Sequence, residues 1–299
     1  MRVLTYIQDG RFSLGLVKGE SNTVVSFSKL GLEYASMEEF IEDYSETMKE
    51  EIEKKLEGVT GIPYESIEKA GVIPHPKSDV ICLGINYAEH AEESARYADE
   101  FSGERPYTIY FSKRVRNTVA DGGIIEGHFD LTEKLDYEVE LAVIIGKEAK
   151  NVSKEDAKDY IFGYTILNDI SARDLQVNHK QWYFGKSLDN FTPIGPWIVT
   201  ADEIAYPPTL NIRSKINGEL RQNSNTNMLI TSIDDVIFEL TKGMTLDAGT
   251  IIAMGTPSGV GLGFVPPKFL KLGDVVECEI ESIGVLSNMI GECCGQAYL

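Results

Sequence analysis

The chain has 299 residues, of which 42% are hydrophobic and 25% are charged, and its formal net charge is −19. This length and composition suit a globular protein with one large domain and one small one. A surface this acidic repels phosphate backbones and anionic lipid headgroups. We therefore expect neither nucleic acid nor a membrane as a partner.

The cysteines and the opening residues bear on the compartment. No apolar run is long enough to span a membrane, and the first residues lack a signal-peptide pattern. Cys82, Cys278, Cys293 and Cys294 form no Cys-x-x-Cys pair, and two adjacent cysteines are poorly placed for an ordinary disulfide. We therefore expect reduced thiols and a cytoplasmic location.

Residues 1–74 predict a small N-terminal α/β domain. Its expected strands are 2–8, 13–17 and 22–30. Residues 36–58 predict one acidic helix ended by Gly58, with an apolar stripe at Met37, Phe40, Ile41, Tyr44 and Met48. The following segment contains Pro74 and Pro76 and predicts a linker, so we place the domain boundary near residue 74.

Residues 75–299 are rich in β-strand patterns. The expected strands are 79–86, 107–114, 137–146, 160–169, 196–204, 210–218, 249–256 and 274–290. Two helices are expected, one beginning at the Ser-x-x-Asp pattern of 153–161 and one over 232–244. The fold class is therefore mostly β with some α (α+β), and not an alternating βαβ chain.

Two glutamates lie at the start of an apolar run in "KLDYEVELAVIIGK". Glu138 and Glu140 are two positions apart, so both lie on one face of a strand. Neighbouring buried carboxylates repel one another, so a cation or a proton must offset their charge. Asp169 ends the next apolar run and would join them if the strands are neighbours. Three carboxylates favour Mg²⁺, Mn²⁺ or Ca²⁺; a metal-free surface cluster is the alternative.

Other polar residues suit catalysis or the binding of an anion. His90 and Glu93 are three residues apart, and a carboxylate that orients an imidazole makes a general base. A surface pair is the alternative. Arg173, Gln176 and Lys186 would suit an anionic substrate, or would merely neutralise the acids.

A glycine-rich loop follows the strand in "IIAMGTPSGVGLGF". It lacks the P-loop and dinucleotide-binding patterns. Its backbone amides and the Thr256 hydroxyl could hold a small carboxylate, and a plain turn is the alternative.

Several stretches, in order along the chain, resemble the fumarylacetoacetate hydrolase family. They are "LDYEVELAVIIGK", "FGYTILNDISARDLQ", "GKSLDNFTPIGPW", "NGELRQ", "MTLDAGTIIAMGTPSGVG" and "PPKFLKLGDVVECEIESIG". The resemblance covers residues 79–290 and is strongest to bacterial acylpyruvate hydrolases, oxaloacetate decarboxylases and 2-hydroxyhepta-2,4-diene-1,7-dioate isomerases. It implies a mixed β-roll catalytic domain over 75–299, usually in a homodimer.

The resemblance also implies roles for individual residues. Glu138, Glu140 and Asp169 match the Mg²⁺ or Mn²⁺ ligands, and His90 and Glu93 match the catalytic dyad. Lys186, Arg173, Gln176 and Thr256 match positions that contact the substrate, and Lys186 would also act in catalysis. Ile85 stands where some relatives carry Arg or Lys, so one contact with a substrate carboxylate is either missing or supplied differently, and Lys113, Arg114 and Arg116 could supply it.

The function that the resemblance implies is a divalent-metal-dependent enzyme for small 2-oxo acids. Such an enzyme would cleave a C–C bond through a metal-stabilised enolate, by acylpyruvate hydrolysis or oxaloacetate decarboxylation. The alternatives are isomerisation of 2-hydroxyhepta-2,4-diene-1,7-dioate and, less favoured, a non-catalytic dicarboxylate-binding protein. The expected partner is a small 2-oxo acid or dicarboxylate substrate.

Overall fold

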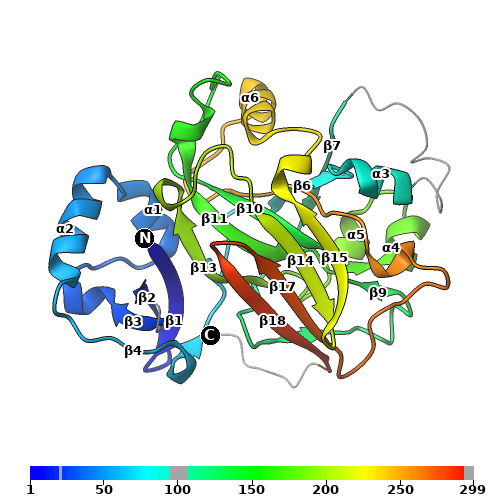
Figure 1. Ribbon diagram of the computed structural model, residues 1–299, viewed down its shortest axis with the longest axis horizontal. Coiled ribbons are helices and arrows are strands. Elements are labelled where there is room, and N and C mark those ends of the chain that lie inside the picture. Colours follow the sequence, from blue (N-terminus) through cyan, green and yellow to red (C-terminus); the bar gives the residue numbers. More distant parts are fainter. Residues whose placement is uncertain (20–21, 95–106, 293–299) are drawn as a thin grey trace.

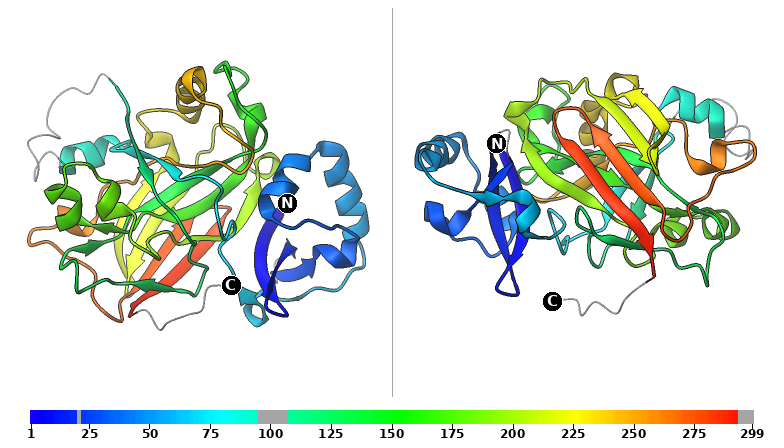
Figure 2. Two further views of the ribbon diagram at one scale, coloured as in Figure 1. Left: turned by 180° about the vertical axis from the view of Figure 1, so that it is seen from behind. Right: turned by 60° about the horizontal axis from the view of Figure 1, so that its bottom comes forward.

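The computed structural model describes residues 1–19, 22–94 and 107–292, which form two open β-sheets with helices around them (Figures 1 and 2). The larger sheet has eleven strands, in the order β4-β3-β2-β1-β13-β11-β10-β16-β6-β7 with β5 paired to β1. Its strands are β1 (Arg2–Gln8), β2 (Arg11–Lys18), β3 (Thr23–Ser26), β4 (Ile62–Pro63), β5 (Glu68–Lys69), β6 (Val80–Gly84), β7 (Ile109–Lys113), β10 (Val139–Ile145), β11 (Ile161–Asn168), β13 (Ile194–Thr200) and β16 (Ile251–Ala253).

A second sheet packs against the first, and a two-stranded ribbon lies beside the site described below. The second sheet has the order β15-β14-β17-β18-β8. Its strands are β8 (Ile124–Glu126), β14 (Asn211–Ile216), β15 (Glu219–Asn225), β17 (Val275–Ile280) and β18 (Gly284–Gly291). The ribbon pairs β9 (Leu135–Asp136) with β12 (Ser171–Ala172). This α+β arrangement confirms the predicted fold class.

Six α-helices lie around the sheets within the described residues. They are α1 (Met37–Asp43), α2 (Glu46–Leu56), α3 (Ala88–Ser94), α4 (Arg173–Asn178), α5 (Tyr183–Lys186) and α6 (Ile233–Gly243). None of the described helices is long and apolar enough to cross a membrane.

The two faces of β10 enter different apolar clusters, because side chains alternate along a strand. Leu141 and Val143 pack in a core shared with the five-stranded sheet. Ala142 and Ile144 face the other way, into a core shared with α1 and α2. Glu138 and Glu140 continue that second face toward the beginning of the strand, so the carboxylates stand where the apolar packing ends.

The N-terminal residues extend the larger sheet at β13. Arg2 and Val3 of β1 pair with Val199 and Ile198, and Lys49 of α2 forms an ion pair of 2.7 Å with Asp202. In Figure 1 these blue elements stand beside the rest of the molecule, joined to it through β1. The division into domains at residue 74 stays a prediction.

The single acidic helix predicted over 36–58 is wrong, because the structure has two helices there. Tyr44 leaves the helical conformation at φ −61° and ψ 132°, which ends α1. The Ser45 side chain then accepts a hydrogen bond from the Met48 amide and caps α2. The periodic stripe runs across the break, since Tyr44 still packs on Phe40 with ring centroids 5.7 Å apart.

Two further predictions were inaccurate in detail. The predicted bonds between Ser153 and Asp156 form, but a turn and a 3₁₀ helix, Ala157–Tyr160, follow them in place of an α-helix over 153–161. The long strand over 274–290 is the hairpin of β17 and β18, with Ser282 at φ 63° in the turn. The Cys82 and Cys278 thiols are free and buried, whereas Cys293 and Cys294 lie outside the described residues.

Candidate active site

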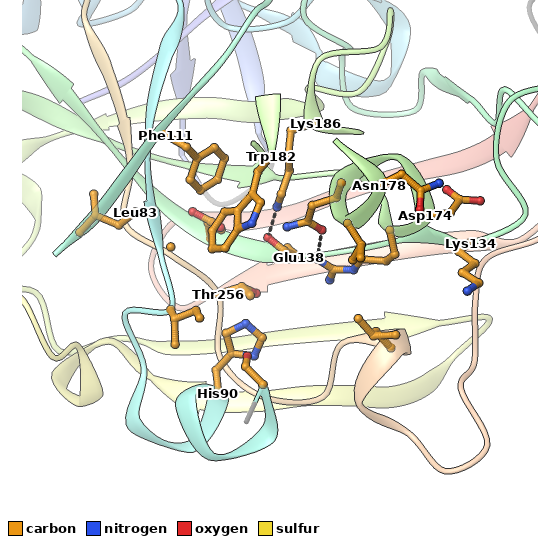
Figure 3. Close-up of a pocket in the computed structure, with 18 residues that line it drawn as sticks. Leu83, His90, Phe111, Lys134, Glu138, Asp174, Asn178, Trp182, Lys186 and Thr256 are labelled. Atoms are coloured by element: carbon orange, nitrogen blue, oxygen red, sulfur yellow. Dashed lines mark hydrogen bonds and ion pairs between the residues drawn. The ribbon is translucent and has the colours of Figure 1, made fainter. Parts of the chain in front are cut away.

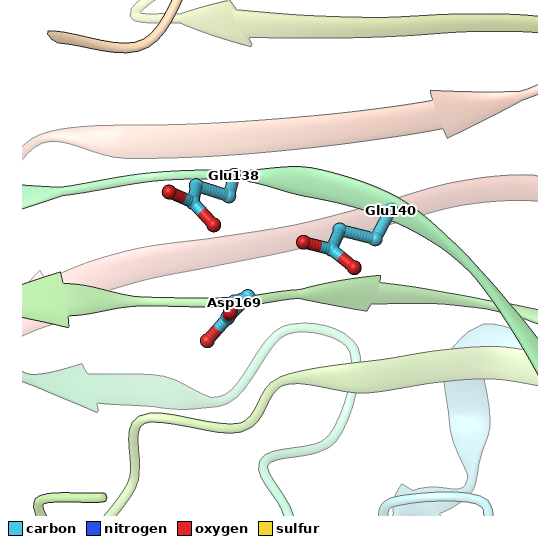
Figure 4. A group of neighbouring side chains, drawn as sticks. All are labelled: Glu138, Glu140 and Asp169. Atoms are coloured by element: carbon cyan, nitrogen blue, oxygen red, sulfur yellow. The ribbon is translucent and has the colours of Figure 1, made fainter. Parts of the chain in front are cut away.

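Strand pairing brings the three predicted carboxylates together. Asp169 donates its amide to the Glu138 carbonyl at 2.9 Å, and Glu140 lies opposite Leu167 in the β10–β11 ladder. One carboxylate oxygen from each of Glu138, Glu140 and Asp169 lies within 4.8 Å of the others, and all three side chains are buried. Figure 4 shows both glutamates directed from β10 toward Asp169 of the neighbouring strand.

Buried cations hold two of the three acids. Lys186 Nζ lies 2.6 Å from both Glu138 Oε2 and Asp169 Oδ2, and Arg173 Nη1 lies 2.7 Å from Glu138 Oε1. Burial by itself would raise the pKa of Glu138, but the charges of Lys186 and Arg173 lower that pKa on balance to about 2. Burial opposes the charged form of Lys186, yet Asp169 and Glu138 raise its pKa on balance.

No cation of the described residues forms a comparable ion pair with Glu140. Its Oε2 accepts a hydrogen bond of 2.7 Å from the Gly255 amide. Burial raises the pKa of Glu140 well above its ordinary value, and the charges of Asp169 and Glu138 raise it further. This carboxylate therefore needs a positive charge to stay ionised.

The donor set fits a hard divalent cation. Its ligand atoms would all be carboxylate oxygens, with no sulfur or imidazole nitrogen in the cluster. Around the triad, four buried carboxylates (Asp136, Glu138, Glu140 and Asp169) face three buried cations (Lys113, Arg173 and Lys186). A divalent cation would offset both the burial and the neighbouring negative charges that raise the pKa of Glu140.

The predicted dyad is formed within α3. His90 Nδ1 lies 2.9 Å from Glu93 Oε2, and both side chains are buried. Since a carboxylate accepts that hydrogen bond, Nδ1 carries a proton, and in the neutral imidazole Nε2 then has a free lone pair. Glu93 Oε1 accepts a second hydrogen bond of 3.0 Å from the Gly259 amide, which fixes the carboxylate against the glycine-rich loop.

The glycine-rich loop binds carboxylates, but they belong to the protein itself. Its amides at Gly255 and Gly259 bond to Glu140 and Glu93, as described above. Gly261 and Leu262 donate to the two oxygens of Asp136, at 2.7 and 2.9 Å. The Thr256 hydroxyl bonds to the Val139 carbonyl and accepts from Gln222 Nε2. The predicted carboxylate cradle for a ligand is thus replaced by internal bonds that order the site.

Asp136 is a site residue that the sequence prediction missed. It is fully buried, and its Oδ2 accepts a hydrogen bond of 2.9 Å from Arg173 Nε. Asp136 thereby joins Arg173 to the loop that holds Glu93. The signal was present in the sequence, because Asp136 continues the alternation of Glu138 and Glu140 by one more step.

The proposed substitutes for a cation at Ile85 are not available to a substrate. Lys113 is fully buried and bonds to Asp169 Oδ1 at 2.8 Å and to the Ile170 carbonyl. Burial lowers the pKa of Lys113, although Asp169 opposes that effect. Arg114 and Arg116 are exposed, and neither lines the cavity. None of these three cations lines the cavity, whereas Ile85 does, and this arrangement favours the alternative that the contact is missing.

Seven of the nine predicted site residues line one cavity of about 310 Å³: His90, Glu138, Glu140, Arg173, Gln176, Lys186 and Thr256. The other two lie behind this lining, Glu93 against His90 and Asp169 against Lys186. In Figure 3, His90 on α3 lies on one side of the cavity, and Glu138 and Lys186 lie on the other. A cavity of this size suits a small molecule.

An α+β fold in which a buried acidic triad and a histidine–carboxylate pair meet at one small cavity defines a candidate active site for a small molecule. Residues 79–291 match the family model for the C-terminal domain of fumarylacetoacetate (FAA) hydrolase. The chain belongs to the fumarylacetoacetate hydrolase family, as the resemblance predicted.

Particular relatives differ in the reaction that their names give. An oxaloacetate tautomerase of Bacillus subtilis strain 168 is 51% identical over 219 residues, 73% of this chain and 71% of the relative. A fumarylacetoacetate hydrolase from psychrophilic Exiguobacterium antarcticum is 35% identical, with a TM-score of 0.79 over 98% of this chain and 99% of its own. Maleylpyruvate hydrolase from Sphingobium sp. SYK-6, in complex with manganese(II) and pyruvate, is 30% identical. Its TM-score is 0.77, over 98% of this chain and 99% of its own.

Proposed function

We propose that this protein is a divalent-metal-dependent enzyme that removes and returns a proton at C3 of small 2-oxo acids of the oxaloacetate type. The observation that carries the proposal is the His90–Glu93 hydrogen bond of 2.9 Å, on an imidazole that lines the same cavity as Glu138 and Glu140. A proton acceptor and a site for a charge-stabilising cation thus face a single bound molecule. The tautomerase relative supports this reaction class.

Glu138, Glu140 and Asp169 would hold Mg²⁺ or Mn²⁺, and the bound cation would act as a Lewis acid toward the keto oxygen of the substrate. The manganese complex of the Sphingobium relative supports this assignment. The chain's own residues then perform the proton transfer. His90 Nε2 takes the C3 proton, and Glu93 stabilises the imidazolium and keeps its orientation. Return of the proton to oxygen gives the enol, and its return to carbon gives the keto form.

Lys186 and Arg173 keep the inner part of the site organised while charge develops on the substrate. Both cations are buried and held by carboxylates, so their positions are fixed before the substrate binds. Fixed charges in a buried site stabilise a transition state without reorganising during the reaction. Gln176 Oε1 accepts from Arg173 Nη1 at 3.1 Å and helps to hold the guanidinium group.

C–C bond cleavage is the second candidate function, and pyruvate bound to the Sphingobium hydrolase favours it. In that reaction His90 Nε2 would take a proton from water that attacks a carbonyl at C4, and the C3–C4 bond would break. For oxaloacetate, loss of the C4 carboxylate as CO₂ needs no attacking water. Isomerisation of a diene dioate would use the same proton transfer at carbon.

One experiment separates these reactions. The enol form of oxaloacetate is followed by its ultraviolet absorbance, with Mn²⁺-loaded or EDTA-treated protein, and pyruvate is measured by proton NMR in the same samples. We expect metal-dependent acceleration of the keto–enol exchange, lost in Glu138→Gln and kept in the exposed control Glu148→Gln. Pyruvate formation from oxaloacetate or acetylpyruvate would favour cleavage. Tight binding of oxalate without turnover of any 2-oxo acid would support the non-catalytic alternative.

A further inference from the structure

The cavity has a second end, away from the carboxylate triad. In Figure 3 its labelled residues Leu83 and Phe111 lie at one end, Glu138 and Lys186 in the middle, and Asp174 and Lys134 at the other end. Apolar side chains, among them Ile85 and Trp182, make up much of the remaining lining. A substrate long enough to extend beyond the triad would therefore reach the charged side chains at this second end of the cavity.

Lys134 lines the same cavity as Glu138 and Glu140. It directly precedes β9, the short strand that contains Asp136, and it stands four residues before Glu138. A fully extended chain of four residues spans roughly 13 Å, which is the upper limit for the distance between the Cα atoms of Lys134 and Glu138. A lysine side chain and a dicarboxylic acid of a few carbons can together cover that span.

The backbone of Lys134 is fixed on both sides. Its amide donates to Thr132 Oγ1 at 3.1 Å, and its carbonyl accepts from the Arg173 amide at 3.0 Å. The Thr132 hydroxyl in turn donates to Asp174 Oδ1 at 2.6 Å. These hydrogen bonds fix the backbone from which the Lys134 side chain extends at the edge of the cavity.

Lys134 is also the cation of the described lining that has no anionic partner. Arg173 is held by Asp136 and Glu138, and Lys186 by Glu138 and Asp169. No carboxylate of the described residues lies within ion-pair distance of Lys134. Asp174, at the same end, is occupied by Thr132 and by the amides of Glu133 and Leu175. The outer cation is therefore free for a ligand.

We propose that Lys134 binds the distal carboxylate of the substrate, so that the enzyme selects 2-oxo dicarboxylic acids over 2-oxo monocarboxylic acids of equal length. This assignment rests on the proposed function, because it takes the 2-oxo end of the substrate to lie at the triad. A contact far from C3 is equally strong in the ground state and the transition state, so it affects KM and leaves kcat unchanged.

The test compares 2-oxoglutarate with 2-oxopentanoate, which have the same five-carbon chain and differ in the terminal carboxylate. Turnover is measured as deuterium exchange at C3 in D₂O by proton NMR, and binding to the Mn²⁺-loaded protein by calorimetry. The variants are Lys134→Gln, Lys134→Arg and the exposed control Lys150→Gln. Loss of one charge-assisted hydrogen bond at the edge of a cavity should weaken the binding of 2-oxoglutarate, so that its KM and Kd rise about tenfold.

We expect this loss of affinity for 2-oxoglutarate in Lys134→Gln and not in the control Lys150→Gln. The affinity for 2-oxopentanoate should not change, and Lys134→Arg should recover part of the affinity for 2-oxoglutarate. Equal effects on the two acids, no effect on either, or equal affinity of the unaltered protein for both would overturn the assignment. If neither acid is turned over but Lys134→Gln still weakens only 2-oxoglutarate binding, the assignment holds and the proposed enzymatic function fails.

Discussion

The Glu140 carboxylate shows at the scale of one residue how this site depends on a cation. It is buried beside two other acids, and one backbone amide is its partner. Burial raises its pKa, and the neighbouring carboxylates raise it further. A group whose pKa is raised by folding stabilises the folded state while it is protonated, and that contribution is lost as pH rises through the raised pKa.

Replacing Glu140 with glutamine should therefore have opposite effects with and without metal. In EDTA, we expect Glu140→Gln to be more stable than the unaltered protein above the raised pKa, because the buried charge is gone. With Mn²⁺, the variant should not show the rise in Tm that metal binding confers on the unaltered protein. Thermal unfolding across pH, with Glu148→Gln as the exposed control, measures both effects. An equal metal-induced rise in both proteins would contradict the metal assignment.

His90 allows a second prediction at this scale. His90→Ala removes the proton acceptor but leaves the three carboxylates in place, so we expect C3 exchange to fall by about two to four powers of ten with little change in Mn²⁺ affinity. Glu93→Gln should show a smaller loss, because the imidazole remains but its orientation and charge stabilisation weaken. The rates come from the deuterium-exchange assay and the affinities from calorimetry. Unchanged exchange in His90→Ala would remove the proton-transfer role.

The glycine-rich loop acts at the scale of an element, because its amides fix the acids of three other segments. The loop approaches Glu93 so closely that a Cβ at Gly263 would lie 1.9 Å from Glu93 Oε1. The clash is with the end of a flexible side chain, so Glu93 would move and the fold would remain. The loop thus sets the geometry of the dyad.

Gly263→Ala should separate catalysis from stability. We expect a loss of roughly tenfold or more in kcat, since a displaced Glu93 no longer orients His90, and a Tm within a few degrees of the unaltered protein. Gly243→Ala is the matched control, because a Cβ there meets nothing within 4 Å. A large fall in Tm with proportional loss of active protein would instead indicate that Gly263 supports the fold.

At the scale of the whole molecule, the N-terminal residues complete the larger sheet. β13 is covered on one edge by β1, and Ile198 and Ile194 share an apolar core with Phe40 of α1. Without residues 1–74, that edge and that core would face water, and open apolar edges associate. The predicted homodimer is a separate matter and stays a prediction.

Deleting residues 1–74 should accordingly give a protein that aggregates, even though the candidate site lies beyond the deletion. Size-exclusion chromatography and thermal unfolding would show this, with Lys49→Gln as the control that removes the ion pairs to Asp202 and Glu46 and leaves the sheet intact. That control should stay soluble with a nearly unchanged Tm, because partly exposed ion pairs contribute little. A soluble fragment with a cooperative transition would instead show that residues 75–299 fold independently.

The sequence by itself predicted most of the central strands of the larger sheet, the α+β class, the family and a set of nine candidate residues. It could do so because alternation along β10 and the spacing of His90 and Glu93 are local properties of the chain. The helix break at Ser45 escaped prediction, because the apolar repeat continues across it and a backbone change at Tyr44 ends the first helix.

Tertiary structure alone decided which charges are free. The sequence left open whether Arg173 and Lys186 bind a substrate or neutralise the acids, and the fold pairs each of them, and Lys113, with a buried carboxylate. Asp136, Glu93 and Glu140 likewise accept hydrogen bonds from the amides of the glycine-rich loop, whereas Lys134 has no anionic partner in the described part of the chain. Partners far apart in sequence meet only when the strands pair, and a local pattern carries no record of those pairings.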